Sequence, residues 1–450
     1  MSNPTRSIFA TLDLGTTGIK GALWGPRGGL VLNARTPAPV VQTEDTGRAW
    51  QSWHVYAQKI VAVVQSLMRA KPANTWAALG ITTQRGTVLG LDADGRPCTE
   101  LISWLDGSGE ADRLTAHGAP ANARVSSLMS IIAESLGHSA IDTSQTCPPE
   151  AHTVHRPRPT IHPPGHLLEA HPVADGPLTG IPKGLPVILA GGDKHCEMLG
   201  VMPALDPQQA ALSLGTAISL GWWVPPGEKT HAEDVPAFVT PTIFDGWQQV
   251  EVGLPGGGSA FRWLQEVLRW SPETPGACFD GPPEVDWPVC VPDFWGRFGV
   301  PGARGGWVGI GPDVPPELLA WSWMEGVLWT LERAAAAHRA EPLTDVWLCG
   351  GGASWAPWSL WGPALLGGCW HQMQGDDAGL IGVARVMRMV LETGVGGDGF
   401  AKAARRYKVM SGASSTAASW SVELLAERRG RFEAAVQALS TASGAGALRG

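Results

Sequence analysis

The chain has 450 residues, of which 44% are hydrophobic and 16% charged, and its formal net charge is −8. This length is sufficient for two domains with full cores, and the acidic balance argues against a nucleic-acid-binding surface. The seven cysteines are widely spaced without a CxxC pair, which argues against a disulfide framework and predicts a reducing cytoplasm. We expect no membrane association either, because the N-terminus is too polar for a signal peptide and no apolar run is long enough to span a bilayer.

The first clear pattern is residues 11–24, TLDLGTTGIKGALW. Apolar and polar residues alternate on both sides of a glycine-threonine turn, which predicts a β-hairpin with Asp13 at its mouth. The backbone N–H groups of Gly15, Thr16 and Thr17 at the tip are suited to binding an anion.

The rest of the N-terminal half mixes helices and strands, which predicts a mixed α/β sheet. The predicted elements are strands at Leu30–Arg35, Ala77–Thr82 and Val88–Leu91 and helices at Trp53–Ala70 and Ser126–Leu136. Residues 147–172 are rich in proline and histidine, which predicts an extended surface connection. The spacing of the histidines fits no metal-ligand motif, which argues against a metal site there. The apolar run Pro186–Ala190 predicts a strand that leads through two glycines to Asp193.

A second copy of the hairpin pattern follows at residues 211–223, ALSLGTAISLGWW, with Gly215 and Thr216 at its turn. One copy in each half predicts a duplicated fold that grips one phosphorylated ligand from both sides. Helices and strands alternate after this hairpin, which predicts a mostly parallel sheet in the second domain. The predicted elements are helices from about Ser259 and at Pro316–His338, Ala378–Glu392 and Val422–Leu439, and strands at Val346–Cys349 and Trp370–Met373. A GxGxxG match at residues 394–399 follows a helix instead of a strand, so we interpret it as a helix end and loop.

A series of these motifs resembles the carbohydrate kinases of the FGGY family. In chain order they read LDLGTTGIKGALW, LGITTQRGTVLGLDADGRP, LISWLD, GGDKHCEMLG, LSLGT, GGGSAFRWL, MEGVLW and CGGGAS. The resemblance implies an α/β fold of two actin-like (ribonuclease H-like) ATPase domains with a central interdomain cleft. It also implies transfer of the γ-phosphate of ATP, with Mg²⁺, to a hydroxyl of a small sugar or polyol. We expect the two domains at residues 1–203 and 204–440, followed by a tail at 441–450.

Two aspartates are the predicted catalytic and metal-binding groups. Asp193 is the candidate general base, because burial in a closed cleft would raise its proton affinity, and the family places its catalytic aspartate in this motif. Asp13 is suited to hold Mg²⁺, which prefers carboxylate and water oxygens. The alternatives are that Asp13 caps its turn and that Asp193 forms an Asx-turn.

The predicted substrate-binding residues are Gln84, Arg85, Trp104, Asp106 and Lys194. Arg85 offers forked donors to two neighbouring hydroxyls, and Trp104 can stack on the carbon face of a polyol or serve the core. Gly86 stands where the glycerol-kinase branch has a glutamate. Lys194 stands where relatives usually have Asn or Gln, so it would favour the ionised base, bind an acidic substrate group, or face solvent.

The nucleotide is assigned to turns of small residues, where backbone and ligand can come close. The predicted ATP-binding residues are Gly15, Thr16, Thr17, Gly215, Thr216, Gly258, Gly351, Gly352 and Ala353.

The segment between Trp104 and Gly191 is shorter than in the family, which leaves the identity of the carbohydrate open and a homodimer as one possible assembly. The alternative function is a catalytically weakened member that binds nucleotide or sugar as a regulator. The presence of both Asp13 and Asp193 favours the enzyme. A more distant actin-like ATPase, such as a chaperone or an acetate kinase, would not need the substrate-loop motif.

Overall fold

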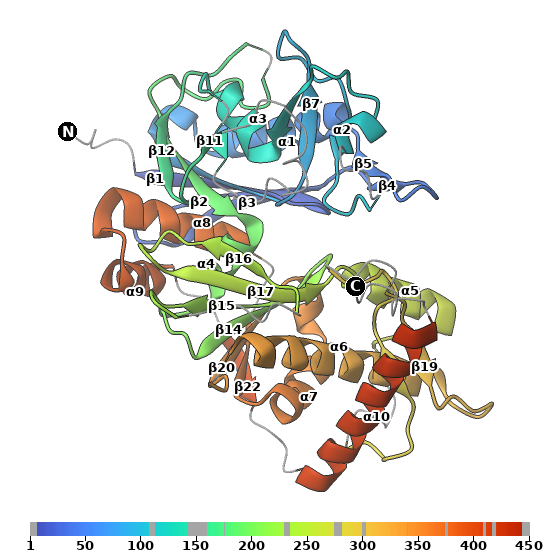
Figure 1. The fold of residues 1–450 in the computed structure, drawn as a ribbon. Helices are drawn as coiled ribbons and strands as arrows, with labels where there is room; N and C mark the ends of the chain where they lie inside the picture. Colours follow the sequence, from blue (N-terminus) through green and yellow to red (C-terminus); the bar gives the residue numbers. More distant parts are fainter. Residues whose placement is uncertain are drawn as a thin grey trace. The chain divides into compact units, whose positions relative to one another are not determined.

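The chain forms two compact units (Figure 1). The computed structural model describes residues 7–107, 113–139, 141–142, 160–174, 176–228, 235–273, 281–298, 303–339, 341–373, 377–407, 411–415 and 420–442. Unit 1 comprises Met1–Leu205, Pro241–Trp247 and Asp377–Lys408, and unit 2 comprises Asp206–Thr240, Gln248–Asp376 and Val409–Gly450. Pro241–Trp247 and Asp377–Lys408 therefore belong to unit 1, although they follow unit 2 residues in the chain. The division expected at residue 203 follows chain order alone.

Unit 1 is built on a six-stranded mixed sheet in the order β12-β13-β6-β1-β2-β3. β1, β2 and β3 pair antiparallel in succession, β6 and β13 run parallel to β1, and β12 is an antiparallel edge strand. The strands are β1 (Ile8–Leu14), β2 (Gly18–Trp24), β3 (Leu30–Pro37), β6 (Trp76–Thr83), β12 (His166–Glu169) and β13 (Pro186–Gly192).

Helices cover both faces of this sheet (Figure 1). Gly21 of β2 lies against α1 (Trp53–Ala70), and Gly80 of β6 lies against α8 (Ala378–Arg388) on the opposite face. Glycine at these strand positions lets the helix backbones approach the sheet closely. α4 (Asp193–Val201) begins directly after β13 and packs on α8.

A second, five-stranded sheet in the order β4-β5-β8-β7-β9 belongs to unit 1 as well. Its strands are β4 (Gln42–Thr43), β5 (Ala49–Gln51), β7 (Val88–Leu91), β8 (Leu101–Ile102) and β9 (Arg124–Ser127). The remaining elements of the unit are α2 (Arg113–Ala116), α3 (Leu128–Ser135), β10 (Ile141–Asp142), β11 (Thr160–Ile161), a π-helical turn (Met389–Thr393) and α9 (Gly397–Arg406).

Unit 2 repeats this plan in a seven-stranded sheet, β16-β17-β15-β14-β20-β21-β22. An antiparallel hairpin again stands beside two parallel strands, followed by an antiparallel edge strand. The strands are β14 (Gln209–Leu214), β15 (Ile218–Val224), β16 (Phe238–Pro241), β17 (Gln248–Leu254), β20 (Asp345–Cys349), β21 (Cys369–Met373) and β22 (Ser411–Ser415). The expectation of a mostly parallel sheet is wrong, because the hairpin and the edge strand contribute antiparallel pairs.

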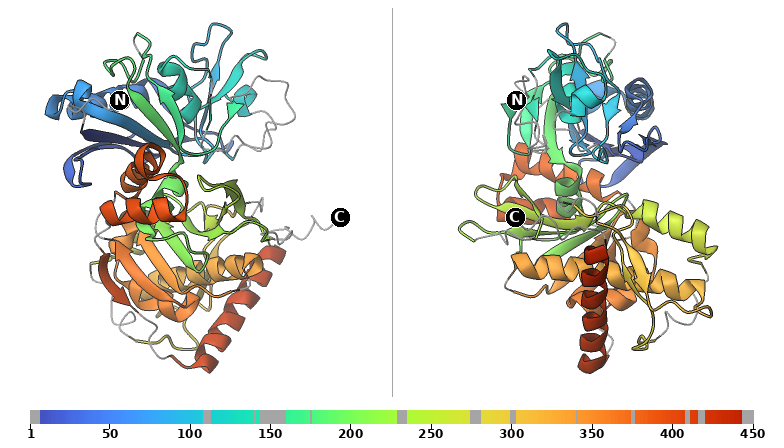
Figure 2. Two further views of the ribbon diagram at one scale, coloured as in Figure 1. Left: turned by 90° about the vertical axis from the view of Figure 1, so that its left-hand side faces the viewer. Right: turned by 45° about the vertical axis from the view of Figure 1, so that its right-hand side comes forward.

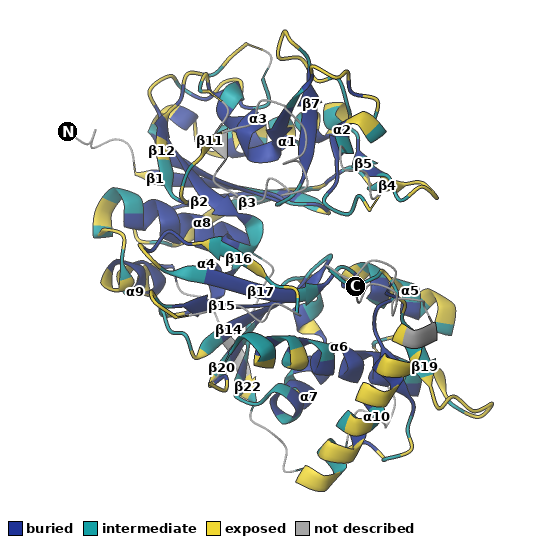
Figure 3. Ribbon diagram, in the orientation of Figure 1, coloured by how far each residue is buried: buried dark blue, intermediate teal, exposed yellow. Residues whose placement is uncertain are grey.

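The core of unit 2 is rich in tryptophan, with Trp321, Trp323, Trp361 and Trp370 almost completely buried. The strands β14 and β15 are drawn almost entirely as buried in Figure 3. The helices of this unit are α5 (Gly258–Leu268), α6 (Pro316–His338), α7 (Pro357–Leu366) and α10 (Val422–Ala442), with a short two-stranded ribbon of β18 (Val289–Val291) and β19 (Gly306–Val308). α10, dark red in Figure 2, packs on β18 and α6.

Most of the predicted elements are confirmed, including both hairpins and the helices at 53–70 and 316–338. The helix predicted at 126–136 begins only at Leu128, because Arg124–Ser127 pairs with β7. The last helix runs to Ala442 and so passes the predicted start of the tail. Of the predicted surface connection at 147–172, residues 147–159 lie outside the described residues, whereas His166–Glu169 forms β12 and pairs with β13. Within the described part of the chain, no helix is long and apolar enough to cross a membrane.

Candidate active site

Asp13 is the penultimate residue of β1, at the mouth of the predicted hairpin, and its carboxylate has an unusual environment. Its Oδ1 is buried and has no hydrogen-bond partner among the described residues. Burial raises the pKa of Asp13 to about 7; Lys20 on the neighbouring strand opposes this rise, and the charge of Asp193 adds to it. A Cβ at Gly379 would lie 2.8 Å from Asp13 Oδ2, so the glycine keeps that side of the carboxylate open.

Hydrogen bonds to the backbone of Gly15 hold the hairpin tip that follows Asp13. The Gly15 carbonyl accepts a 2.9 Å hydrogen bond from the hydroxyl of Tyr56, which is fully buried on α1. The N–H of Gly15 donates to the Gly18 carbonyl within the turn. Gly15 is therefore not a backbone donor for phosphate, contrary to the expectation from the sequence, and the N–H groups of Thr16 and Thr17 are the remaining donors of that expectation.

The Thr16 hydroxyl is committed to a buried network inside the protein. It donates to Gln84 Oε1 at 2.6 Å and accepts a 2.8 Å hydrogen bond from Trp104 Nε1. Gln51, which is fully buried, donates to the Thr16 carbonyl at 2.9 Å and accepts from Gln84 Nε2 at 3.2 Å. The first hairpin and the predicted substrate loop are thus tied together. Neither Gln51 nor Tyr56 belongs to a motif, so no sequence signal pointed to either residue.

Arg85 and Asp193 lie together, as their shared assignment to the site requires. Arg85 Nε is 3.5 Å from Asp193 Oδ1, and both side chains are mostly covered. Asp193 is the first residue of α4, and its Oδ1 accepts the N–H of Lys194 at 2.9 Å. The Lys194 ammonium extends instead to Glu197 Oε2, at 2.8 Å. This ion pair within α4 explains the position of the Lys194 side chain without a contact to a ligand.

The carboxylate of Asp106 is surrounded by protein groups that hold it in place. Its side chain is completely enclosed, and Oδ2 accepts from the N–H of Ala49 at 2.8 Å and contacts His117 Nε2 at 2.7 Å. Arg113 Nε lies 3.6 Å from the other oxygen. A carboxylate held in this way cannot also take a substrate hydroxyl without losing a buried partner. We therefore assign Asp106 to the support of the loop after Trp104.

The second Gly-Thr hairpin, formed by β14 and β15 of unit 2, contacts the start of helix α5. The N–H groups of Gly257 and Gly258 donate to the carbonyls of Thr216 and Gly215, at 2.9 and 2.7 Å. A Cβ at Gly257 would lie 2.6 Å from the Gly215 oxygen, so only glycine permits this contact. The N–H of Gly258 is consequently used within the protein and is not a phosphate donor.

The glycine-rich turn after β20 lies against the same hairpin. Gly350 has φ +88°, a conformation that favours glycine, and a Cβ there would lie 2.8 Å from the Leu214 backbone. A short 3-10 turn, Gly351–Ser354, follows it. This contact places Gly352 beside the hairpin, whereas Gly351 is exposed and Ala353 is buried.

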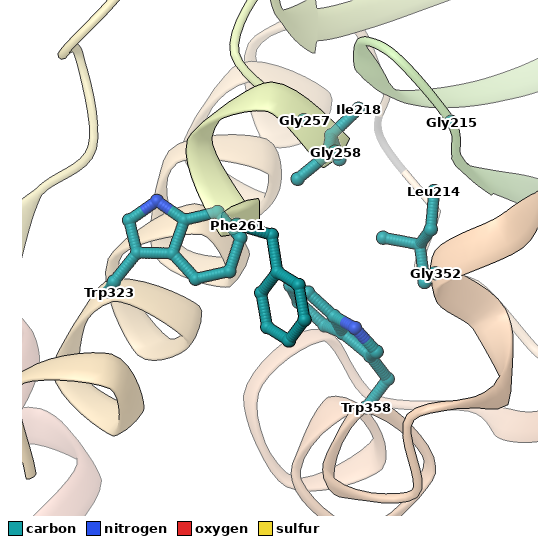
Figure 4. A pocket seen from close by; sticks show the side chains of 9 residues that line it. All are labelled: Leu214, Gly215, Ile218, Gly257, Gly258, Phe261, Trp323, Gly352 and Trp358. Atoms are coloured by element: carbon teal, nitrogen blue, oxygen red, sulfur yellow. The ribbon is translucent and has the colours of Figure 1, made fainter. Parts of the chain in front are cut away.

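These elements of unit 2 surround a pocket with an empty volume of about 300 Å³ (Figure 4). Aromatic rings stand on one side of it and the backbone of the hairpin and the glycine turn on the other. Its lining residues are Leu214, Gly215, Ile218, Gly257, Gly258, Phe261, Trp323, Gly352 and Trp358. Gly215, Gly258 and Gly352 were predicted from the sequence; the aromatic residues were not, because tryptophan and phenylalanine at helical spacing are typical of any core. An apolar pocket with ring faces on one side and glycine backbone on the other suits a planar ring system.

Comparisons with known proteins agree with this architecture. Residues 8–133 match the N-terminal domain of the FGGY family of carbohydrate kinases. Gluconate kinase from Lactobacillus acidophilus has a similar structure, with a TM-score of 0.78 at 17% identity over 97% of this chain and 99% of that one. A ligand-bound xylulose kinase from the same organism gives 0.75 at 16% over 98% and 99%. Glycerol kinase from Plasmodium falciparum with ADP gives 0.74 at 14% over 96% and 98%.

No curated protein sequence matches the chain. At these identities the solved structures show the shared fold, and the predicted α/β fold is confirmed. Residues 8–133 therefore resemble the N-terminal domain of the FGGY family of carbohydrate kinases, and the fold of such kinases is shared over the whole length of the chain.

Proposed function

We propose that this protein is a carbohydrate kinase that transfers the γ-phosphate of ATP to a hydroxyl of a small sugar or polyol, with Asp193 as general base. The observation that supports this most is the grouping in unit 1 of Asp193, Arg85 and Asp13. Arg85 lies beside Asp193, and the charge of Asp193 acts on Asp13. Phosphoryl transfer needs little more from the protein than positioning and charge stabilisation.

Asp193 has the position of a base that meets a substrate. Its carboxylate stands at the first turn of α4, where the helix dipole favours the ionised form. The guanidinium of Arg85 at 3.5 Å favours the same form, and the ionised carboxylate is the form that accepts a proton. In this proposal the acceptor hydroxyl gives its proton to Asp193 as it attacks the phosphorus atom.

Asp13 is the proposed Mg²⁺ ligand. Its buried oxygen lacks a partner among the described residues, and Gly379 keeps space beside the other oxygen. This donor set fits a hard cation that takes one or two carboxylates and several waters. When bound, Mg²⁺ would supply charge neutralisation for the phosphates. A cation there would also remove the cost of ionising a carboxyl whose pKa burial has raised to about 7.

The pocket of unit 2 is the proposed adenine site. Phe261, Trp323 and Trp358 provide apolar ring faces, and Gly352 allows the ligand to lie on the backbone. The related glycerol kinase structure contains ADP, in line with this proposal. That both Gly-Thr hairpins act on a single ATP molecule remains a prediction, as do the cytoplasmic location and a homodimer.

The acceptor contact that we retain is Arg85. Gln84 is buried and Lys194 is paired with Glu197, so these two are assigned to positioning. Trp104 is half-buried and its indole nitrogen donates to Thr16, and a stacking role for its ring stays a prediction. The related kinases act on xylulose, gluconate and glycerol by name, so polyols, ketoses and sugar acids are the first candidates.

The test is an ADP-release screen of the purified protein over glycerol, tetritols, pentuloses, deoxy sugars and sugar acids. We expect turnover with one acceptor class and a loss of about 10²-fold or more in Asp193→Asn, with ATP binding retained. Asp94→Asn, in an exposed turn, is the matched control and should leave turnover unchanged. ATP binding without turnover on any acceptor would favour the regulator instead.

A further inference from the structure

Three potential metal ligands stand together on the sheet of unit 2. Cys369 and His371 are two residues apart on β21, so their side chains emerge on the same face. Asp345 of β20 is the parallel-strand partner of Cys369. One ligating atom from each of the three lies within 4.8 Å of the others, and all three residues are half-buried. Among the described residues, no other group of three His, Cys, Asp or Glu side chains brings its ligating atoms this close together.

The neighbouring groups already orient these side chains. His371 Nε2 lies 2.6 Å from Asp345 Oδ1, while Nδ1 lies 3.0 Å from the Ser414 hydroxyl on the adjacent β22. Asp345 Oδ2 accepts a 2.9 Å hydrogen bond from the Thr344 hydroxyl, and Trp347 stacks on the imidazole at 4.3 Å. A metal-binding histidine typically has its other ring nitrogen fixed in this manner, and a ligating carboxylate is itself hydrogen-bonded.

We propose that Asp345, Cys369 and His371 bind a Zn²⁺ ion. A thiolate, an imidazole and a carboxylate are ligands that zinc accepts, and the sulfur disfavours Mg²⁺ and Ca²⁺. Bond lengths of about 2.0–2.3 Å in a tetrahedral site place ligand atoms roughly 3.3–3.8 Å apart. Small side-chain rotations reach this spacing, as Nε2 and Oδ1 separate from their hydrogen bond. The thiol of Cys369 releases its proton to solvent, and water fills the fourth position.

The site is separate from the proposed nucleotide pocket. Asp345 and Cys369 begin their strands, whereas the glycine turn that lines the pocket follows the end of β20. Zinc would join β20 to β21 and, through Ser414, order the edge strand β22. We therefore assign it a stabilising role in unit 2, independent of the transfer reaction.

The test titrates the metal-free, full-length protein with Zn²⁺ and with Co²⁺ as a spectroscopic substitute. We expect one equivalent to bind, with a thiolate-to-cobalt charge-transfer band. Cys369→Ser should abolish the band, and both Cys369→Ser and His371→Asn should weaken zinc binding by at least about 100-fold, more than the loss of an outer-shell partner. Cys98→Ser is the matched control, because Cys98 is the other half-buried cysteine among the described residues. It should leave the band unchanged.

A second measurement needs no variant. One equivalent of zinc should slow alkylation of Cys369 in the natural protein, with Cys98 as the internal reference, as read from peptide masses. This readout separates the site from zinc bound by the histidines of residues 147–172 or by Asp13. Cobalt binding without a thiolate band, or equal alkylation of Cys369 with and without zinc, would overturn the proposal.

Discussion

The hydroxyl of Thr16 donates a 2.6 Å hydrogen bond to the side-chain oxygen of Gln84, which is 68 residues away in the chain. Both residues are buried. The first belongs to the proposed phosphate hairpin and the second precedes Arg85, which contacts the proposed base. A change at either residue therefore reaches both parts of the site in unit 1.

Thr16→Val should impair turnover by way of this bond. Valine keeps the shape of threonine but removes the hydroxyl, leaving Gln84 Oε1 and Trp104 Nε1 without this partner. The free energy of unfolding should fall by about 1–3 kcal/mol, the cost of unsatisfied buried polar groups. We expect kcat to fall about tenfold, measured as ADP release. Thr43→Val, at an exposed position of β4, should do neither; equal effects of the two variants would contradict the network.

Asp13→Asn should remove a pH dependence of stability. The folded pKa of about 7 lies above the ordinary value of 3.8, so between these pH values the folded protein holds a proton that the unfolded chain has lost. Stability should therefore fall as pH rises from about 4 to about 7 and then level off. Thermal unfolding in EDTA at pH 5.5 and 8 should show this difference in the natural protein and a smaller one in the variant.

The same carboxyl predicts how Mg²⁺ binding depends on pH. The cation needs the ionised form, so Mg·ATP affinity should rise with pH up to about 7, with uptake of the metal releasing a proton. Calorimetry in buffers of different ionisation enthalpy measures that proton. Unchanged Mg·ATP affinity in Asp13→Asn at pH 8 would remove Asp13 as the metal ligand.

Phe261→Leu should weaken nucleotide binding. The ring lines the pocket of unit 2 and packs on Trp355 and Trp323, with centroids 5.0 and 5.8 Å apart. Loss of one aromatic face should cost about 1 kcal/mol, or roughly fivefold in Kd for ADP by calorimetry. Val267→Ala, exposed on the same helix, is the control. If both variants bind ADP like the natural protein, the adenine site lies elsewhere.

Arg428→Met should destabilise unit 2. The guanidinium forms a buried ion pair with Glu325 of α6 and donates to the carbonyls of Trp287 and Pro288. Its removal leaves a buried carboxylate without its cation, at a cost of about 3–5 kcal/mol. Arg429→Met, which loses partly exposed ion pairs, should cost no more than about 1 kcal/mol. Tryptophan fluorescence during denaturation follows the difference, because the core of unit 2 is rich in tryptophan.

Local signals in the sequence were sufficient for the elements and for part of the site. The alternation around Gly15 and Gly215 predicted both hairpins, because the period of a strand and the chemistry of a turn are local properties. The assignment of Asp106 to substrate rested on its place in a motif and missed His117, which contacts it from eleven residues further on. The sequence predicts the Gly15 N–H as an anion donor and Gly258 as an ATP-binding residue, but it does not reveal that each N–H bonds a nearby backbone carbonyl.

The sequence by itself determined the α/β class and the duplicated hairpins, since each depends on residue type and short-range periodicity, and it predicted Asp13 and Asp193 as site residues. Only the tertiary structure decided that Thr16 bonds Gln84, that Lys194 pairs with Glu197 and that Phe261 backs a pocket with Gly352. It also assigned residues 377–408 to unit 1, where α8 covers the sheet behind Asp13. Most of these contacts join segments that are distant in the chain. They depend on which apolar faces pack together in the folded protein, and a local sequence pattern does not specify that packing.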